Sequence, residues 1–466
     1  MEQIRCKVLV VGGGPGGYVA AIRAGQLGLD TVLVEAGKLG GTCLIRGCIP
    51  SKALIHVADK LHAMATHAEA AKLGIKLSQA PEFDLAGAVH WKDEVVGKLN
   101  TGVAGLLKRA KVRVVSGWAT FSDAKTCTVE GDKPVTIIAE HVILANGSVP
   151  AALAHLPFGG NVISSTEALS LNTLPKHLVV VGAGYIGLEL GIAFRKMGAH
   201  VAVVEAQNRI LPQYDAALSA PVKQSLEKLN IPLYLNAKAQ KLADKKKGLI
   251  VETADGKTVM LPADKILVTV GRRPNTLGWG LENMCVDMAG PFIKVDDQCR
   301  TAMKNVWAIG DLVGEPMLAH KASAQGEMVA EIIAGKRCKF APIAIPAVCF
   351  TDPEIVTVGL SPDAVKAQKT DVITGIFPLA ANGRALSMEA ASSGGFVRVM
   401  ARADDHRILG IDAVGPHVSE LSGEFSLALE MGAVLEDIAG VIHAHPTLSE
   451  SFHEAALKTL GHAIHI

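Results

Sequence analysis

Two stretches of the chain, 170 residues apart, repeat one pattern without a gap. Residues 6–36 read CKVLVVGGGPGGYVAAIRAGQLGLDTVLVEA, and residues 176–206 read KHLVVVGAGYIGLELGIAFRKMGAHVAVVEA. Each contains a β-branched run, a glycine-rich turn, an amphipathic stretch, a second apolar run and a glutamate, which together predict a β-α-β unit. Repeats of solenoid proteins are much shorter, roughly 20–50 residues. The chain is therefore predicted to contain two separate nucleotide-binding domains of the α/β class.

Each unit has the glycine spacing G-x-G-x-x-G directly after its first strand. The glycines are Gly12, Gly14 and Gly17 in the first unit, and Gly182, Gly184 and Gly187 in the second. The first glycine permits a tight turn, the second lets the backbone approach a pyrophosphate, and the third lets the helix pack on the strand. The phosphates then lie at the helix N-terminus. The alternative is a glycine turn with a purely structural role.

A glutamate ends the second strand of each unit, Glu35 in the first and Glu205 in the second. Such a carboxylate accepts hydrogen bonds from ribose hydroxyls. At position 205 it would also repel a 2′-phosphate, which predicts NAD rather than NADP. Arg209, Arg272 and Arg273 could bind a 2′-phosphate, but none of them occupies that position, and an exposed strand-end glutamate is the other interpretation. A second nicotinamide would be redundant, so the first site is predicted to bind FAD.

Of the eight cysteines, only Cys43 and Cys48 are close in sequence, within GGTCLIRGCIPSK. On an ideal helix their Cα atoms would be about 8–9 Å apart, whereas a disulfide needs about 4.4–6.8 Å. Gly47 would permit the necessary distortion, and Pro50 favours an early helical position. A helix N-terminus lowers the pKa of a thiol. We predict a redox-active disulfide rather than a metal site, because no second Cys/His pair has partner spacing.

The C-terminal segment 443–450 reads HAHPTLSE. Thiol–disulfide exchange needs a base near the attacking sulfur, and histidine suits that role. A carboxylate such as Glu450 can orient the ring of His445. Thr447 and Glu450 also match a helix capping box, in which Pro446 is ordinary. The residues alone leave both interpretations open.

Composition narrows the class of protein further. Forty-six Lys and Arg against 45 Asp and Glu give a net charge of +1, so neither nucleic acid nor an anionic membrane is expected as a partner. The apolar run 8–22 is too short to cross a bilayer and is followed by no cleavage site. Scattered cysteines are typical of a reducing compartment, which predicts a cytoplasmic protein.

A coarse reading of periodicity places the remaining elements. Helices are predicted at 51–73, 91–111, 216–229, 419–431 and 447–460. Strands are predicted within 112–143, with turns at Gly117, 122–125 and 131–134, and at 305–309, 373–377, 396–401 and 408–414.

The order of these motifs resembles the pyridine nucleotide–disulfide oxidoreductases, and among them the dihydrolipoamide dehydrogenases. The resemblance covers essentially the whole chain and includes 307–311 (WAIGD), 317–320 (MLAH), 351–354 (TDPE) and 382–385 (NGRA). It implies two Rossmann-like dinucleotide-binding domains and a C-terminal α+β dimerisation domain. The implied boundaries are 1–148 for FAD binding, 149–271 for NAD binding, 272–343 for a central domain that completes the FAD site, and 344–466 for the interface domain.

The resemblance also implies roles for matching residues. Cys48 would lie beside the flavin, and Cys43 would exchange with substrate. His445, with Glu450 as its partner, would be the acid–base residue and would reach the disulfide of the other subunit of an obligate homodimer. The implied FAD-binding residues are Gly12, Gly14, Gly17, Glu35, Thr42, Lys52, Gly117, Asn146, Gly147, Asp311, Met317, Leu318, Ala319 and His320. The implied NAD-binding residues are Gly182, Gly184, Ile186, Gly187, Glu189, Glu205 and Gly271.

The activity that the resemblance implies is NAD-dependent oxidation of dihydrolipoamide carried by the lipoyl-bearing acyltransferase of a 2-oxo acid dehydrogenase complex. Ile45-Arg46 and 325–328 (QGEM) resemble the branched-chain form. The alternatives are service to another such complex, NADH-dependent reduction of a different disulfide, or a non-catalytic flavoprotein subunit. Three departures from the family are Arg46, which could raise the thiolate fraction of the dithiol, Asn146, where the family usually has threonine, and 323–325 (SAQ), where the family commonly has an acidic run.

Overall fold

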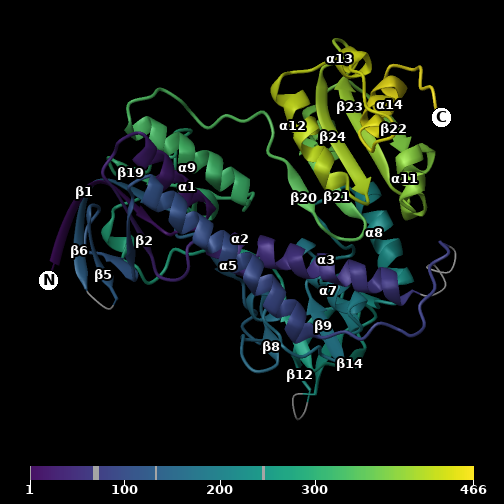
Figure 1. The fold of residues 1–466 in the computed structure, drawn as a ribbon, viewed down its shortest axis with the longest axis horizontal. Helices are drawn as coiled ribbons and strands as arrows, with labels where there is room; N and C mark the ends of the chain where they lie inside the picture. Colours follow the sequence, from purple (N-terminus) through teal and green to yellow (C-terminus); the bar gives the residue numbers. More distant parts are fainter. Residues whose placement is uncertain (1, 67–72, 132–133, 244–246) are drawn as a thin grey trace.

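The computed structural model describes residues 2–66, 73–131, 134–243 and 247–466. Figure 1 shows three lobes: the first glycine-rich unit lies at the left, the second at the lower right, and the C-terminal segment at the upper right. Each lobe is built around its own sheet. The predicted fold, with two dinucleotide-binding units and a C-terminal α+β domain, is confirmed, whereas the four domain boundaries remain predictions.

The first sheet has the order β3-β2-β1-β6-β5-β4, with β19 paired to β6. Its strands are β1 (Glu2–Val11), β2 (Thr31–Glu35), β3 (Arg113–Ser116), β4 (Trp118–Phe121), β5 (Thr126–Glu130), β6 (Val135–Leu144) and β19 (Val306–Ala308). β1 pairs in parallel with β2 and β6, as a β-α-β unit requires. The parallel pairing of β19 with β6 shows that the central segment returns to this sheet.

Two helices pack closely on the first sheet, α1 (Pro15–Gln26) and α9 (Ala319–Ile333). They lie side by side although they are far apart in sequence (Figure 1). Gly326 permits this contact, because a Cβ atom there would lie 2.4 Å from the carbonyl oxygen of Gly16. The residues just before α9 are thereby held beside the first glycine-rich loop.

The second sheet is entirely parallel, with the order β11-β10-β9-β15-β8. Its strands are β8 (Val162–Ile163), β9 (His177–Val181), β10 (His200–Val204), β11 (Leu233–Tyr234) and β15 (Lys265–Val268). The helices of this lobe are α6 (Ser165–Ala168), α7 (Tyr185–Lys196) and α8 (Ala216–Lys228), and an antiparallel sheet beside it comprises β12 (Lys238–Leu242), β13 (Gly248–Glu252) and β14 (Thr258–Pro262). Strands buried on both faces explain the continuous apolar runs in the sequence.

The third sheet is antiparallel, with the order β20-β21-β24-β23-β22. Its strands are β20 (Ala347–Cys349), β21 (Glu354–Gly359), β22 (Val372–Pro378), β23 (Phe396–Arg402) and β24 (Ile408–Gly415). Its helices are α10 (Pro362–Gln368), α11 (Gly383–Ser387), α12 (Ser422–Glu430), α13 (Leu435–Gly440) and α14 (Glu450–Thr459). Phe425 and Phe452 are fully buried and meet edge to face, which joins α12 to α14 in the core.

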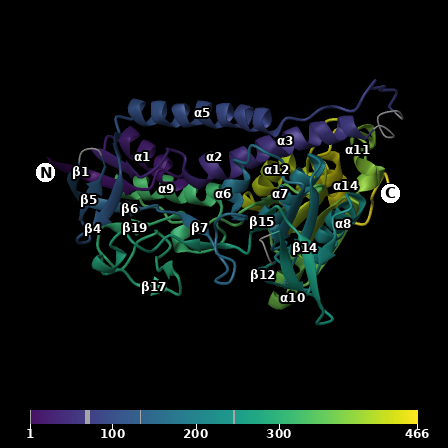
Figure 2. The same cartoon turned by 90° about the horizontal axis from the view of Figure 1, so that it is seen from below.

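Two long helices connect the lobes, α3 (Cys48–Ala65) and α5 (Leu85–Arg109). Figure 2 shows α5 as the outermost helix, alongside α3. Leu54 of α3 and Val89 of α5 pack in the core of the second lobe, whereas Val103 and Leu107 of α5 pack in that of the first. The start of α3, where Cys48 lies, is therefore fixed at the junction of the two lobes.

The remaining elements of the described residues are short. They are α2 (Gly41–Arg46), β7 (Ser148–Pro150), β16 (Arg272–Pro274), β17 (Met288–Ala289), β18 (Phe292–Ile293), and the 3-10 turns Leu281–Asn283, Gly310–Val313, Leu379–Ala381, Ala390–Ser393 and Val418–Leu421. None of the helices in the described ranges has the length and apolar character that a bilayer crossing requires.

Most predicted elements are confirmed, and the errors lie at their ends. The helix predicted at 51–73 begins at Cys48 and ends at Ala65, and the part at 67–72 lies outside the described residues. The helix predicted at 91–111 begins at Leu85, because the Asp84 carboxylate accepts the N–H groups of the first turn. The prediction for 419–431 was wrong at its start, where a 3-10 turn precedes α12. The predicted turn at 131–134 includes 132–133, which lie outside the described residues.

Candidate active site

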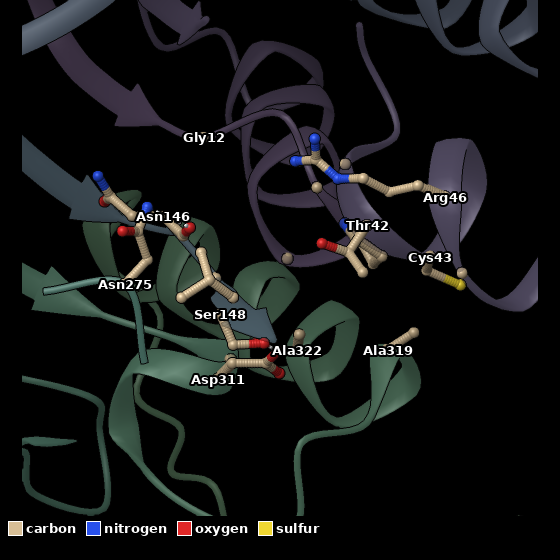
Figure 3. Close-up of a pocket in the computed structure, with 18 of the residues that line it drawn as sticks. Gly12, Thr42, Cys43, Arg46, Asn146, Ser148, Asn275, Asp311, Ala319 and Ala322 are labelled. Carbon is tan, nitrogen blue, oxygen red and sulfur yellow. Dashed lines mark hydrogen bonds between the residues drawn. The ribbon is translucent and has the colours of Figure 1, made fainter. Parts of the chain in front are cut away.

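A cavity of about 580 Å³ lies where the first lobe, the second lobe and the start of α9 meet. Many of the residues that sequence analysis assigned to FAD line it: Gly12, Gly14, Glu35, Thr42, Lys52, Gly117, Asn146, Gly147, Asp311, Met317 and Ala319. Cys43, Cys48, Ile186 and Glu189 line the same cavity. Figure 3 shows several of these side chains converging on it.

Other predicted residues lie outside this lining. Gly17 is inside α1, Leu318 precedes α9, and the His320 ring Nε2 lies 2.8 Å from the carbonyl oxygen of Pro346. The glycines of the second loop follow β9 or lie at the start of α7, Glu205 follows β10, and Gly271 lies between β15 and β16; none of them lines this cavity. His445 and Glu450 lie in the third lobe.

The first glycine-rich loop has a backbone that only glycine can adopt. Gly12 has φ +103°, and a Cβ atom there would lie 2.3 Å from the carbonyl oxygen of Ala145. A Cβ atom at Gly17 would lie 1.7 Å from the carbonyl oxygen of Gly12. A Cβ atom at Gly41 would lie 2.5 Å from Gly14 Cα. The loop therefore presents bare backbone to the cavity at the N-terminus of α1, as a pyrophosphate site requires.

The two glycine-rich loops have the same internal geometry at the same sequence offset. Glu35 accepts hydrogen bonds from the N–H groups of Gly13 (2.6 Å) and Gly37 (2.7 Å). Glu205 accepts them from Ala183 (2.7 Å) and Gln207 (2.8 Å). Glu205 is only 8% exposed. The alternative interpretation of Glu205 as a solvated strand-end residue is therefore wrong, and its charge faces the loop.

Polar groups along the cavity are suited to a bound dinucleotide. Asn146 Oδ1 is buried and has no hydrogen-bond partner within the described chain. An orphaned buried acceptor is costly unless a further group satisfies it. Ser148 donates to Asp311, and the Arg272 guanidinium Nε donates to Ser148 Oγ at 2.8 Å. With the glycine cradle, these residues fit FAD.

Arg272 and Ser148 were not assigned to this cavity by sequence analysis, and Arg272 was considered only as a 2′-phosphate ligand. The antiparallel pairing of β16 with β7 brings Arg272 to Ser148. No local pattern carries that information, because the two strands are more than 100 residues apart.

The two cysteines lie on either side of a break between helices. Cys43 lies in α2, which ends at Arg46, and Cys48 is the first residue of α3. Gly47 between them has φ −148° and ψ −111°, which interrupts the helical path. The predicted distortion at Gly47 is thus confirmed.

The two thiols have opposite tendencies to ionise. The hydrogen bond from the Cys43 thiol lowers the pKa of Cys48, and the Lys52 ammonium group lowers it further, against the opposing effect of burial. The same hydrogen bond, with burial, raises the pKa of Cys43. Arg46, which we expected to favour the thiolate, is not among the main charges acting on either thiol. Cys48 is the thiol that this environment favours as a thiolate.

Lys52 and Glu189 form an ion pair beside Cys48. Lys52 Nζ lies 2.8 Å from Glu189 Oε2, and Glu189 is only 4% exposed. The other oxygen of Glu189 accepts the N–H of Phe350 at 2.9 Å, and Lys52 Nζ lies 4.4 Å from the centroid of the Phe350 ring. The connecting helix α3, the second lobe and the third lobe therefore meet at this pair.

Glu450 contacts His445 and forms only half of the predicted capping box, because the N-cap residue of α14 is Ser449 and no side chain caps the helix. Its Oε1 lies 2.9 Å from His445 Nδ1, and its Oε2 accepts the N–H of Thr447 at 2.8 Å. Burial raises the pKa of Glu450, but the bonds to Thr447 and His445 outweigh this and hold it below its usual range. The His445 side chain is 78% exposed, so its Nε2 faces outward from its own subunit.

A second histidine–glutamate pair lies beside this one. His443 Nε2 lies 2.9 Å from Glu424 Oε1 in α12, and this bond raises the pKa of His443 against the effect of burial. Sequence analysis missed the pair, because Glu424 lies 19 residues upstream on another helix. The pair anchors the segment that carries His445.

Comparison with known proteins finds matches to one family over most of the chain. Residues 6–326 match the pyridine nucleotide-disulphide oxidoreductase family, and residues 345–456 match its dimerisation domain. The dihydrolipoyl dehydrogenase of Pseudomonas aeruginosa is 58% identical over 469 residues, with 100% of both chains covered. Dihydrolipoyl dehydrogenase 2 of Haloarcula marismortui is 47% identical, with 98% of each chain covered.

Among solved structures, LpdA from Mycobacterium tuberculosis matches with a TM-score of 0.89 at 27% identity, covering 98% of this chain and 99% of that one. The sequence identity over the full length and the structural match therefore point to the same family as the fold, the two glycine-rich loops and the dithiol. The chain belongs to the dihydrolipoyl dehydrogenase family of the pyridine nucleotide-disulphide oxidoreductases, flavoprotein enzymes that use FAD and NAD.

Proposed function

We propose that the protein oxidises protein-bound dihydrolipoamide to lipoamide and passes the electrons to NAD. One observation carries this proposal: Cys43 and Cys48 line the same cavity as the first glycine-rich loop and as Ile186 and Glu189 of the second nucleotide-binding unit. A dithiol in that position connects a disulfide substrate to two dinucleotides. The names of the full-length relatives support dihydrolipoyl as the substrate group.

The cavity residues would hold FAD, with its pyrophosphate at the N-terminus of α1 and its flavin ring beside Lys52 and Cys48. When bound, FAD accepts two electrons from the dithiol and delivers them as hydride to NAD. Glu205 would bind the NAD ribose hydroxyls and disfavour a 2′-phosphate, while Ile186 and Glu189 would line the nicotinamide pocket. Segment 272–343 would complete the FAD site, as the pairing of β19 with β6 supports.

The protein groups would move protons and thiolates in a defined order. His445 Nε2 takes a proton from one thiol of dihydrolipoamide, and Glu450 stabilises the resulting imidazolium through Nδ1. The substrate thiolate attacks Cys43 Sγ and breaks the Cys43–Cys48 bond, so Cys48 leaves as a thiolate. The second substrate sulfur then attacks the first and breaks the mixed disulfide to Cys43, and its proton passes to the leaving Cys43 sulfur. The products are lipoamide and the reduced dithiol with Cys48 as the thiolate.

The proposed acid–base residue comes from the other subunit. His445 lies outside the cavity of its own chain and is largely exposed, and residues 345–456 match a dimerisation domain, which supports a homodimer. His445 of the partner subunit would therefore face Cys43, and a monomer would lack a complete site.

The lipoyl-bearing acyltransferase of a 2-oxo acid dehydrogenase complex is the proposed partner, and the branched-chain complex is the proposed subtype. The support for the subtype is the sequence at Ile45-Arg46 and 325–328. Reconstitution with the acyltransferase components of different complexes tests it. Equal coupling to a non-branched-chain component would contradict the subtype but leave the reaction intact.

Turnover of dihydrolipoamide with NAD tests the main proposal. Cys48→Ser should retain FAD and lose turnover, because the intramolecular disulfide cannot form. Cys285→Ser, which removes an exposed cysteine outside the cavity, is the matched control and should keep turnover. Faster turnover with a different disulfide than with lipoamide would favour an NADH-dependent reductase of that compound instead.

A further inference from the structure

Arg46 contributes a cation to the cavity that has no protein counter-charge. It is the last residue of α2, it is exposed, and it lines the cavity. It forms no salt bridge or side-chain hydrogen bond with another residue in the part of the chain that the structure describes. An exposed Arg guanidinium at the wall of a cavity is available to bind an anionic group of a ligand.

The acidic residues of the same cavity are already engaged. Both oxygens of Glu35 accept backbone N–H groups. Glu189 is bound to Lys52 and to the backbone of Phe350. Asp311 accepts from Ser148, and its charge acts on Arg272. None of these carboxylates forms an ion pair or a side-chain hydrogen bond with Arg46 in the described part of the chain.

The direction of Arg46 separates it from the dithiol. In Figure 3 the Arg46 side chain extends past Thr42 toward the loop that carries Gly12, whereas the Cys43 sulfur points away from that loop. Arg46 therefore faces the nucleotide side of the cavity.

The loop toward which the Arg46 side chain extends has the features of a phosphate site. The loop at Gly12 and Gly14 presents bare backbone at the N-terminus of α1, a 12-residue helix with no acidic residue in its first turn. The partial positive charge of that terminus and a guanidinium fork together suit a doubly charged pyrophosphate. We propose that Arg46 is a positioning residue that binds the pyrophosphate of FAD from the side opposite α1, a role that rests on the FAD site proposed above.

The rate of FAD release from the purified holoenzyme tests this role. Loss of a charged hydrogen bond should make release from Arg46→Gln about ten- to a hundredfold faster than from the wild type. Arg46→Lys should fall between the two, because an ammonium group cannot bind two phosphate oxygens in a fork. Release should also lose part of its salt dependence in Arg46→Gln, because one ionic contact is gone.

Arg109→Gln is the matched control, because Arg109 ends α5 in the same lobe, is exposed and lies outside the cavity. Its FAD release should equal that of the wild type. FAD release from Arg46→Gln at the wild-type rate would overturn the proposal, and an altered KM for dihydrolipoamide would then assign Arg46 to the substrate channel. A wild-type protein that purifies without FAD would instead contradict the proposed site itself. If Arg46→Gln fails to fold, judged by circular dichroism, Arg46→Lys decides by the same release rate.

Discussion

Lys52 Nζ lies 2.8 Å from Glu189 Oε2, which joins the helix that begins at Cys48 to the helix of the second nucleotide loop. The two residues are 137 positions apart. Since Lys52 also lowers the pKa of Cys48, this pair couples the packing of the lobes to the chemistry of the dithiol.

Removing the charge of Glu189 should destabilise the fold. Glu189→Gln leaves the Lys52 ammonium group without a charged partner in a largely buried position. Breaking a fully buried ion pair lowers stability by more than this. Because the Lys52 side chain keeps some contact with solvent, we expect a loss of about 2 kcal/mol in the free energy of unfolding. Urea unfolding measures this. Glu82→Gln, at an exposed glutamate, should change the midpoint little. An unchanged midpoint for Glu189→Gln would show that the pair is not stabilising.

The same pair should set the pH at which the reduced dithiol ionises. The Lys52 charge lowers the pKa of Cys48 and the Glu189 charge raises it. Lys52→Met should therefore move thiolate formation to higher pH, and Glu189→Gln should move it to lower pH. Ultraviolet thiolate absorbance of the reduced protein, titrated with pH, follows both shifts. Shifts in the same direction for the two variants would contradict the electrostatic explanation.

The linked stability change has a defined sign. The pKa of Cys48 is lower in the folded than in the unfolded state, so ionisation stabilises the reduced protein above the unfolded pKa, about 8.5. That contribution is lost as the pH falls through the folded pKa. Lys52→Met should reduce this pH dependence of the urea midpoint.

Substitutions of His445 and Glu450 should differ in their effects on turnover and on the free energy of unfolding. His445→Gln should lower turnover by about 10²–10⁴-fold with little change in stability, because the ring is 78% exposed. Glu450→Ala should lower turnover and also cost about 1 kcal/mol, because the N–H of Thr447 loses its acceptor. Turnover and urea unfolding of each variant separate the two effects. His462→Gln, in the exposed C-terminal tail, is the control. A stability loss without a turnover loss in His445→Gln would leave this segment only a structural role.

Glu205 should determine the nucleotide preference. Its carboxylate lies against the second glycine-rich loop, bound to the N–H groups of Ala183 and Gln207. Glu205→Gln removes the charge that repels a 2′-phosphate, and the NADH-over-NADPH ratio of specificity constants should fall about tenfold, equivalent to about 1.4 kcal/mol. Glu227→Gln, on the exposed face of α8, should leave the ratio unchanged. Comparable wild-type constants for the two nucleotides would contradict the role of Glu205.

The glycine-rich loops and the break between the two cysteines could be predicted from the sequence. Gly12 and Gly182 open equivalent turns with φ +103° and +100°, and the glycine spacing predicted both loops. The break at Gly47 was also predictable, because the backbone preferences of glycine and the reach of a disulfide are properties of a few adjacent residues. The ends of helices were predicted less well, since caps such as Asp84 compete with hydrophobic periodicity.

The composition of the site was decided by tertiary structure. The pairing of Lys52 with Glu189, the contact of Arg272 with Ser148 and the direction of Arg46 each depend on which elements pack together. Glu450 illustrates the limit: its spacing matched both a capping box and a histidine partner. Only the folded chain shows one oxygen on His445 and the other on the Thr447 N–H, with Ser449 rather than Thr447 as the N-cap residue. Sequence patterns of glycine and apolar residues act over a few bonds and determine the β-α-β units. The meeting of side chains more than 100 residues apart follows from the packing of whole lobes, which no local pattern encodes.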